Sequence, residues 1–399
     1  NTKLSAIDNQ HLNDNTNATA GDCSDQDSQN SSLQTNENQA SEFPDKSTVS
    51  HYANLKNTFI YFLETGRLPW YAVPELLEEF VQPIHFEEAL SDTSFLAQLK
   101  KLFDSHPESL ARFVTQFTAE TIEILIVSLL QQKGKATALN SKIGNPELQS
   151  FIYELIITKL IDSSPELYAE KWDRLQSAIK SFFKTKLEQN QFERHMEELF
   201  FEIGFSKQDF EKWKNLMQAS TIKNKTSEDQ TTNDKDIYIR NAGLILAYPF
   251  LKELLRRANC LNNQNRMRKE KQDYAVHLLH FLGTGHEMSI EHELTFEKFL
   301  CGLPFNQPVI RNMELREEDK IECVDLLKSV IENWTALKNT SSEGLRQNFF
   351  QRNGKLDLRQ SPIKLHVERN TIDVLLEKLP WSVSVVKLPW MDDLIFVEW

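Results

Sequence analysis

Four histidines and a cysteine gather in one short part of the chain, where side chains of this kind could bind a metal ion. They are His277, His280, His286, His292 and Cys301. His286-Glu287 begins like a metalloprotease motif, but the next histidine, His292, is six residues away, and two zinc ligands on one helix face need positions i and i+4. No further ligands accompany His277 and His280 at a recognisable spacing. We therefore predict no metal site and no cofactor, and expect these histidines on the surface or at helix ends.

Residues suited to phosphate binding or nucleophilic chemistry also lack the context that such chemistry needs. Gly283-Thr284-Gly285 follows a helical stretch, whereas a phosphate-binding loop follows a strand and continues with Gly-Lys-Ser or Gly-Lys-Thr. We interpret these glycines as the C-terminal cap of a helix. Ser341 and Ser342 are not at a nucleophile elbow and suit a helix N-terminus. No catalytic residues converge in the sequence, so we predict that the protein is not an enzyme.

The tripeptide Leu-Pro-Trp occurs three times, at residues 68–70, 379–381 and 388–390. Proline ends the preceding element, and tryptophan adds a large apolar surface with one N–H donor. Such a tryptophan can fill the core at an element boundary, or it can bind a partner, because tryptophan is enriched among the residues that dominate interface energies. The sequence leaves both roles open for four tryptophans: Trp70, Trp381, Trp390 and Trp399.

Composition and charge narrow the class of partner. A net charge of −13 argues against nucleic acid or an anionic membrane surface. Uncharged apolar stretches such as Ile124–Leu130 are far shorter than the roughly 20 residues of a membrane span. The cysteines contain no C-x-x-C pair, which is typical of reduced thiols in a cytoplasmic protein. The chain begins with Asn1 rather than Met, so it can be a fragment.

Two polar stretches divide the chain. Residues 1–48 hold eight acidic side chains, two lysines and one aromatic residue, Phe43. This tract cannot bury enough apolar area to offset chain entropy, so we predict that it is disordered. Residues 221–236 are predicted to be a polar linker. The remaining segments are a helical domain, 49–220, and a C-terminal domain, 237–399.

The elements expected in these two domains are mainly helices. Apolar residues of the helical domain recur every three to five positions, and frequent Pro and Gly stops keep each helix short, so we expect a packed bundle or array. In the C-terminal domain, one helix face carries Ile321, Val324, Leu327, Ile331 and Trp334, and Thr340–Glu343 predicts a capping box. Alternation at 363–367 and 382–385, with the apolar run 394–397, predicts strands. The predicted fold class is mainly α, with an α+β C-terminal domain and a small sheet of about three strands.

Several phrases of the C-terminal domain resemble the tape-measure family of contractile injection systems, the phage-tail-like particles that bacteria assemble. They cover about 160 residues and include Tyr238-Ile239-Arg240-Asn241-Ala242-Gly243-Leu244 and Trp334-Thr335-Ala336-Leu337-Lys338-Asn339-Thr340-Ser341. Others lie at 249–251, 275–279, 300–304, 344–346, 379–381, 388–391 and 397–399. Upstream, Phe62-Leu63-Glu64-Thr65-Gly66-Arg67-Leu68-Pro69-Trp70 resembles the N-terminal phrase of the family.

The resemblance implies a structural protein that is cytoplasmic during assembly and then inside the particle, where it sets the inner-tube length and engages the baseplate. Its partners would be inner-tube and baseplate or spike proteins, with a homo-oligomer inside the tube as a further expectation. The many helix stops depart from a simple ruler, which should contain a long uninterrupted helix. Two other classes stay open: an assembly adaptor or chaperone that binds tube or baseplate proteins, and a loaded effector or enzyme.

Overall fold

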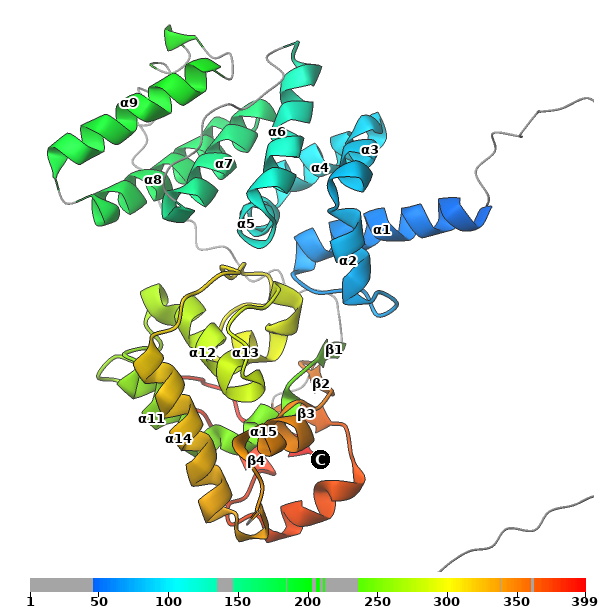
Figure 1. Cartoon of the computed structure of the whole chain (residues 1–399), viewed down its shortest axis with the longest axis vertical. Coiled ribbons are helices and arrows are strands. Elements are labelled where there is room, and N and C mark those ends of the chain that lie inside the picture. Colours follow the sequence, from blue (N-terminus) through cyan, green and yellow to red (C-terminus); the bar gives the residue numbers. More distant parts are fainter. Residues whose placement is uncertain are drawn as a thin grey trace, which may run out of the picture. The chain divides into compact units, whose positions relative to one another are not determined.

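The computed structural model describes residues 46–134, 146–183, 185–202, 206–208, 211, 236–337, 339–359 and 362–399. The predicted disordered tract lies outside these residues, except for 46–48, which begin the first helix, and so does the predicted linker, except for Asp236. Residues 46–399 belong to one compact unit, whose elements are labelled in Figure 1. None of the described helices is long and apolar enough to span a membrane.

Helices make up the described part of the first segment. They are α1 (Lys46–Thr65), α2 (Pro74–Phe80), α3 (Pro83–Ser91), α4 (Thr93–Ser105), α5 (Pro107–Gln116), α6 (Ala119–Gln132), α7 (Pro146–Leu160), α8 (Pro165–Phe182) and α9 (Lys186–Glu202). Proline opens several of them because its missing N–H would have no partner in the first turn. The side chains of Asp92, Thr118 and Ser164 cap α4, α6 and α8.

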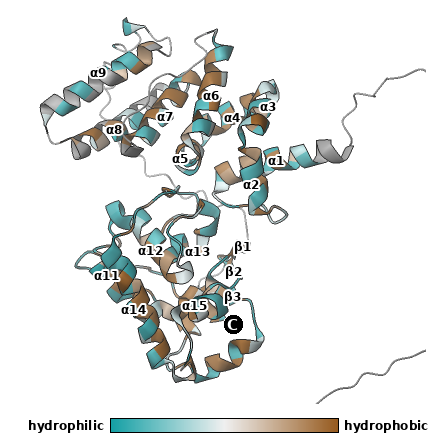
Figure 2. Ribbon diagram, in the orientation of Figure 1, coloured by the Kyte–Doolittle hydropathy of each residue, from teal (hydrophilic) through white to brown (hydrophobic). Residues whose placement is uncertain are grey.

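Aromatic rings fill the core of the helical segment. Phe59 of α1 packs against five other phenylalanines, with ring centroids 4.9–6.4 Å apart. Apolar and polar positions alternate along the helices, as Figure 2 shows, and the apolar faces of α1–α9 contribute to one cluster of buried residues. Short helices of this kind are stabilised mainly by packing. The expected packed helical array is therefore present in the described residues.

The C-terminal segment mixes short helices and strands around a second core. In chain order these are β1 (Asp236–Ile239), η1 (Ala242–Ala247), α11 (Tyr248–Arg257), η2 (Lys269–Lys271), α12 (Gln272–Thr284), η3 (Glu291–Glu293), α13 (Thr295–Leu300), α14 (Glu317–Asn333), η4 (Thr335–Leu337), α15 (Ser342–Leu345), η5 (Arg346–Phe350), β2 (Gly354–Asp357), β3 (Ile363–Val367), η6 (Thr371–Lys378), β4 (Val385–Val386) and β5 (Ile395–Glu398). Trp334 is fully buried there and stacks edge-on against Phe349.

The sheet has five strands, in the order β1-β2-β3-β5-β4, so the expected number of about three was too low. The predicted strand 363–367 is confirmed as β3, and the last apolar run forms β5, parallel to β3. The two additional strands, β1 and β2, have four residues each and pair with one another, Asp236 opposite Asp357. Strands this short carry little alternation, so their pairing depends on tertiary contacts.

Two local predictions in this segment need correction, and one is confirmed. Ile321 is 60% exposed, because the buried face of α14 runs through Cys323, Leu327 and Val330 and is rotated from the predicted one. Ser341, not Thr340, caps α15 and accepts a hydrogen bond from the Gly344 N–H, so the predicted capping box does not form. Gly285 ends α12 in the left-handed region, at φ 81°, as the sequence predicted.

Candidate functional site

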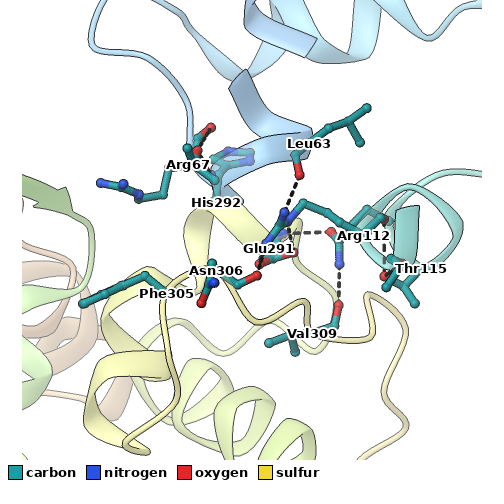
Figure 3. Close-up of polar contacts among 12 residues, drawn as sticks. Leu63, Arg67, Arg112, Thr115, Glu291, His292, Phe305, Asn306 and Val309 are labelled. Carbon is teal, nitrogen blue, oxygen red and sulfur yellow. Dashed lines mark hydrogen bonds and ion pairs between the residues drawn. The ribbon is translucent and has the colours of Figure 1, made fainter. Parts of the chain in front are cut away.

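A buried polar junction connects the helical segment with the C-terminal segment. Its centre is Arg112 on α5, whose side chain is fully buried together with that of Glu291 in η3. Arg112 Nε donates to Glu291 Oε2 at 2.9 Å, and Arg112 Nη2 lies 3.3 Å from Glu291 Oε1. This two-pronged geometry is the strong form of a guanidinium–carboxylate pair. Figure 3 shows the pair with its backbone acceptors.

Arg112 also donates two hydrogen bonds to backbone carbonyls. Arg112 Nη1 donates to the Leu63 carbonyl of α1, and Nη2 donates to the Asn306 carbonyl at 2.6 Å. Arg112 therefore joins α1, α5 and the C-terminal segment. Because an unpaired buried charge costs several kcal/mol, such a residue is tolerated only when all its partners are in place.

A second cation completes the junction. Lys298 of α13 is 2% exposed, and its Nζ donates to Glu291 Oε1 and to the Phe305 carbonyl, both at 2.7 Å. Burial lowers the pKa of Lys298, while the Glu291 carboxylate opposes this effect. Two cations thus share one carboxylate, which makes Glu291 the residue on which the charge balance depends.

Gln116, at the end of α5, connects the two segments through hydrogen bonds of its uncharged side chain. Its Nε2 donates to the Val309 carbonyl at 2.5 Å, and its Oε1 accepts from the Glu291 N–H at 2.9 Å. The Gln116 carbonyl accepts from Arg311 Nη1 at 2.9 Å. On the apolar side, Ile290 packs against the core of the helical segment. The junction is therefore held largely by directed hydrogen bonds.

Gly66 allows the segment of residues 65–70 to pack closely against the junction. Its φ of 72° lies in the left-handed region, which glycine adopts without strain. A β-carbon at Gly66 would lie 3.0 Å from Glu291 Cδ and 3.1 Å from Arg112 Nε, and it would overlap Glu291 Oε1. The backbone of the chain thus passes directly over the buried ion pair.

The histidines do not form a common site. Among the described residues, no group of three or more His, Cys, Asp or Glu side chains is arranged to hold a metal ion. The expected surface position is wrong for His277 and His280, which are buried. His277 Nε2 donates to the Ile310 carbonyl at 2.6 Å, and His280 Nδ1 lies 3.3 Å from Glu297 Oε1, so each has a polar partner that permits burial. His286 is exposed, as predicted.

His292 lies beside the junction (Figure 3). Its ring is edge-on to the ring of Phe62, with the ring centroids 6.3 Å apart. Neither ring nitrogen is accessible to solvent or has a hydrogen-bond partner within the described residues. Burial lowers the pKa of His292 to about 4. The imidazole is therefore neutral at pH 7, next to the charged Arg112–Glu291 pair.

The cysteines of the described segments are structural. Cys260, Cys301 and Cys323 are buried free thiols. Burial raises the pKa of Cys260 and of Cys323 to about 12 and raises that of Cys301 as well. Because the thiolate is the reactive form, these thiols are poor nucleophiles.

The structure separates the candidate tryptophans. Trp390 is buried and donates from Nε1 to the Leu300 carbonyl at 2.7 Å. Trp381 is partly buried, donates to the Leu246 carbonyl at 3.0 Å, and contacts the Phe250 ring. Trp399 also packs partly against the second core. Trp70, by contrast, is 89% exposed.

Sequence reasoning did not single out Arg112, Gln116, Glu291 or Lys298. A local signal was present: Glu297 and Lys298 lie between Phe296 and Phe299 on a short apolar helix, where charged residues are unusual. Lys298 contacts Glu291, which lies only seven residues earlier, but this spacing does not reveal the junction, because Arg112, the other partner of Glu291, lies 179 positions away.

The chain as a whole, including the residues of this junction, matches one known protein family. Residues 5–399 match the profile of a family described as "Contractile injection system tape measure protein". The chain belongs to this family. No curated protein and no solved structure matches it.

Membership of the tape measure protein family confirms the resemblance seen in the C-terminal phrases and extends it over nearly the whole chain. The family is a structural class rather than an enzyme class, and its members belong inside the contractile injection particle together with its other components. The charged groups of the buried junction hold two segments of the chain together.

Proposed function

We propose that this chain sets the length of the inner tube and engages the baseplate or spike end of the particle, and that residues 46–399 act there as a folded module. Tape measure membership supports the first part. The second part departs from the picture of a single extended helical ruler.

The Arg112–Glu291–Lys298 junction carries the proposal of a folded module. It connects the core of the helical segment with the C-terminal segment through fully buried charges. Unfolding the helical array would expose its apolar faces and break this junction at the same time. The longest described helix, α1, has 20 residues, which corresponds to a span of only about 30 Å.

Deletion of α8 and α9, residues 165–202, tests this proposal. If the helical segment extends as a ruler, removing these residues shortens the tube by up to about 57 Å at 1.5 Å per residue. If the segment stays folded, the deletion exposes the core and abolishes assembly, and no short particles form. Tube lengths measured by electron microscopy distinguish the two. A graded shortening would contradict the folded module and support the ruler.

An assembly adaptor or chaperone is the second candidate, and the exposed Trp70 favours it, because a solvent-facing tryptophan suits a transient partner. An adaptor leaves once assembly is complete, whereas a tape measure stays inside the tube. Quantitative mass spectrometry of purified particles separates these roles. Absence of this chain from complete particles would support the adaptor.

A further inference from the structure

Residues 66–73 form the loop that connects α1 and α2, which we call the Trp70 loop. Contacts with the rest of the protein fix its conformation. Gly66 packs against the Arg112–Glu291 pair, and Arg67 and Pro69 are buried. The Gly66 N–H donates to the Phe62 carbonyl at 2.8 Å, and the Ala72 N–H donates to the Pro69 carbonyl at 2.9 Å. The loop therefore has a defined conformation before it meets any partner, which lowers the entropy cost of binding.

The tip of this loop presents apolar side chains to solvent. Trp70 is 89% exposed, Tyr71 44% and Val73 53%. The Trp70 and Tyr71 rings are edge-on, with centroids 5.8 Å apart. The second and third Leu-Pro-Trp tryptophans, in contrast, use their N–H groups and rings inside the C-terminal segment. A rigid exposed tryptophan next to a tyrosine is typical of an interface anchor.

Acidic residues flank the loop on both sides. Glu64 near the end of α1, and Glu75 and Glu78 of α2, are exposed, and none of the three carboxylates has an ion-pair partner among the residues that the structure describes. The cation within the loop, Arg67, is buried. The surroundings of the aromatic tip are therefore negatively charged.

The negative charge around the Trp70 loop indicates which kind of partner can bind it. Residues 1–48 of the same chain hold eight acids and two lysines, and a second copy of the chain carries a net charge of −13. Both would be repelled by the acidic border of the loop. A partner with lysines or arginines around an apolar pocket is complementary in both charge and polarity.

We propose that the Trp70 loop docks into an apolar pocket bordered by Lys or Arg on another protein of the injection particle. The partner accepts the Trp70 ring, and Glu64, Glu75 and Glu78 pair with its basic residues. This docking rests on the proposed function only in that it takes the partner from the same particle.

Zero-length cross-linking tests the docking. Cells that express the complete set of particle genes with a tagged version of this chain are lysed and treated with a carbodiimide, which joins carboxylates to lysine amines. The tagged chain is then captured under denaturing conditions, and cross-linked peptides are identified by mass spectrometry. We expect Glu64, Glu75 or Glu78 to be joined to a lysine of one other particle protein, and the yield to fall at least tenfold in Trp70→Ala.

Two controls separate docking from folding. Tyr238→Ala removes another exposed aromatic residue, 71% exposed on β1, and should leave the cross-link unchanged. Trp70→Ala should retain the wild-type circular dichroism spectrum and unfolding midpoint. Raising the salt concentration before cross-linking should reduce the wild-type yield, because the contact depends on charge.

An undiminished cross-link in Trp70→Ala would overturn the proposal. So would cross-links confined to a second copy of this chain or to Lys3 or another lysine of its own. Tube length after deletion of α8 and α9 is a separate measurement. Docking can therefore be confirmed when the length-setting role is contradicted, and the length-setting role can be confirmed when docking is contradicted.

Discussion

Arg112 and Glu291 form a fully buried ion pair across 179 positions of the chain, with Nε of Arg112 2.9 Å from Oε2 of Glu291. Lys298 contacts the same carboxylate. Removing the carboxylate charge leaves two cations in a site that excludes water. We therefore expect Glu291 to be the most sensitive position of the junction.

We predict that Glu291→Gln destabilises the protein by about 3–5 kcal/mol, as measured by urea unfolding, because Arg112 and Lys298 lose their counter-charge. The control Glu253→Gln removes the carboxylate of an exposed cluster with Arg256 and Arg257 and should be close to wild type. A double-mutant cycle with Arg112→Met should show strong coupling to Glu291. Additive effects of the two substitutions would contradict the ion pair.

Gly66 offers a matched test of how the loop packs on the junction. Gly66 and Gly134 both have positive φ, 72° and 64°, so alanine strains the backbone at either site by about 1 kcal/mol. At Gly66 the new methyl group also meets Glu291 and Arg112, whereas at Gly134 nothing lies within 4 Å. Gly66→Ala should therefore cost about 1–3 kcal/mol more than Gly134→Ala in the free energy of unfolding. Equal costs would show that the loop does not press on the ion pair.

We predict that low pH destabilises the folded protein because His292 becomes protonated. The pKa of this histidine is about 4 in the folded protein and about 6.5 when unfolded. The unfolded state therefore binds more protons between these values, and the free energy of unfolding should fall by up to roughly 3 kcal/mol as the pH drops from 6.5 to 4. Well above pH 6.5, where the imidazole is neutral in both states, this contribution does not change.

The His292 effect is isolated by comparing wild type with His292→Gln over the same pH range. Burial raises the pKa of Asp273, which acts in the opposite direction, but this acid is present in both proteins. His286→Gln, a change at an exposed histidine, should keep the wild-type pH dependence. If His292→Gln keeps it as well, His292 does not cause the acid sensitivity.

The Leu-Pro-Trp repeats should behave differently on substitution. Trp390→Ala removes a buried ring and its bond to the Leu300 carbonyl, so we expect a loss of about 3–5 kcal/mol in unfolding free energy. Removal of residues 379–399 should also remove β4 and β5 and cause aggregation. Trp70→Ala should leave stability near wild type, because its ring is already in solvent. Similar losses at Trp70 and Trp390 would show that Trp70 packs in a core.

The sequence by itself determined the features that depend on near neighbours. The helical class and the cap at Gly285 follow from backbone chemistry within one turn. Pro74 and Pro107 were predicted as helix boundaries, and the structure shows that helices begin there. The strand 363–367 was predictable because its alternation spans five residues. The family was also recognisable from the C-terminal phrases, since these are runs of consecutive residues.

Tertiary structure decided which distant groups meet. The same Leu-Pro-Trp tripeptide yields a buried Trp390 and an exposed Trp70, because burial depends on what the rest of the chain brings to each site. The β1–β2 pair and the contact of Arg112 with Glu291 join segments far apart in sequence. The Arg112–Glu291 pair affects the stability of the protein strongly only when folding removes the water around it, since an ion pair has its large effect in a site closed to solvent.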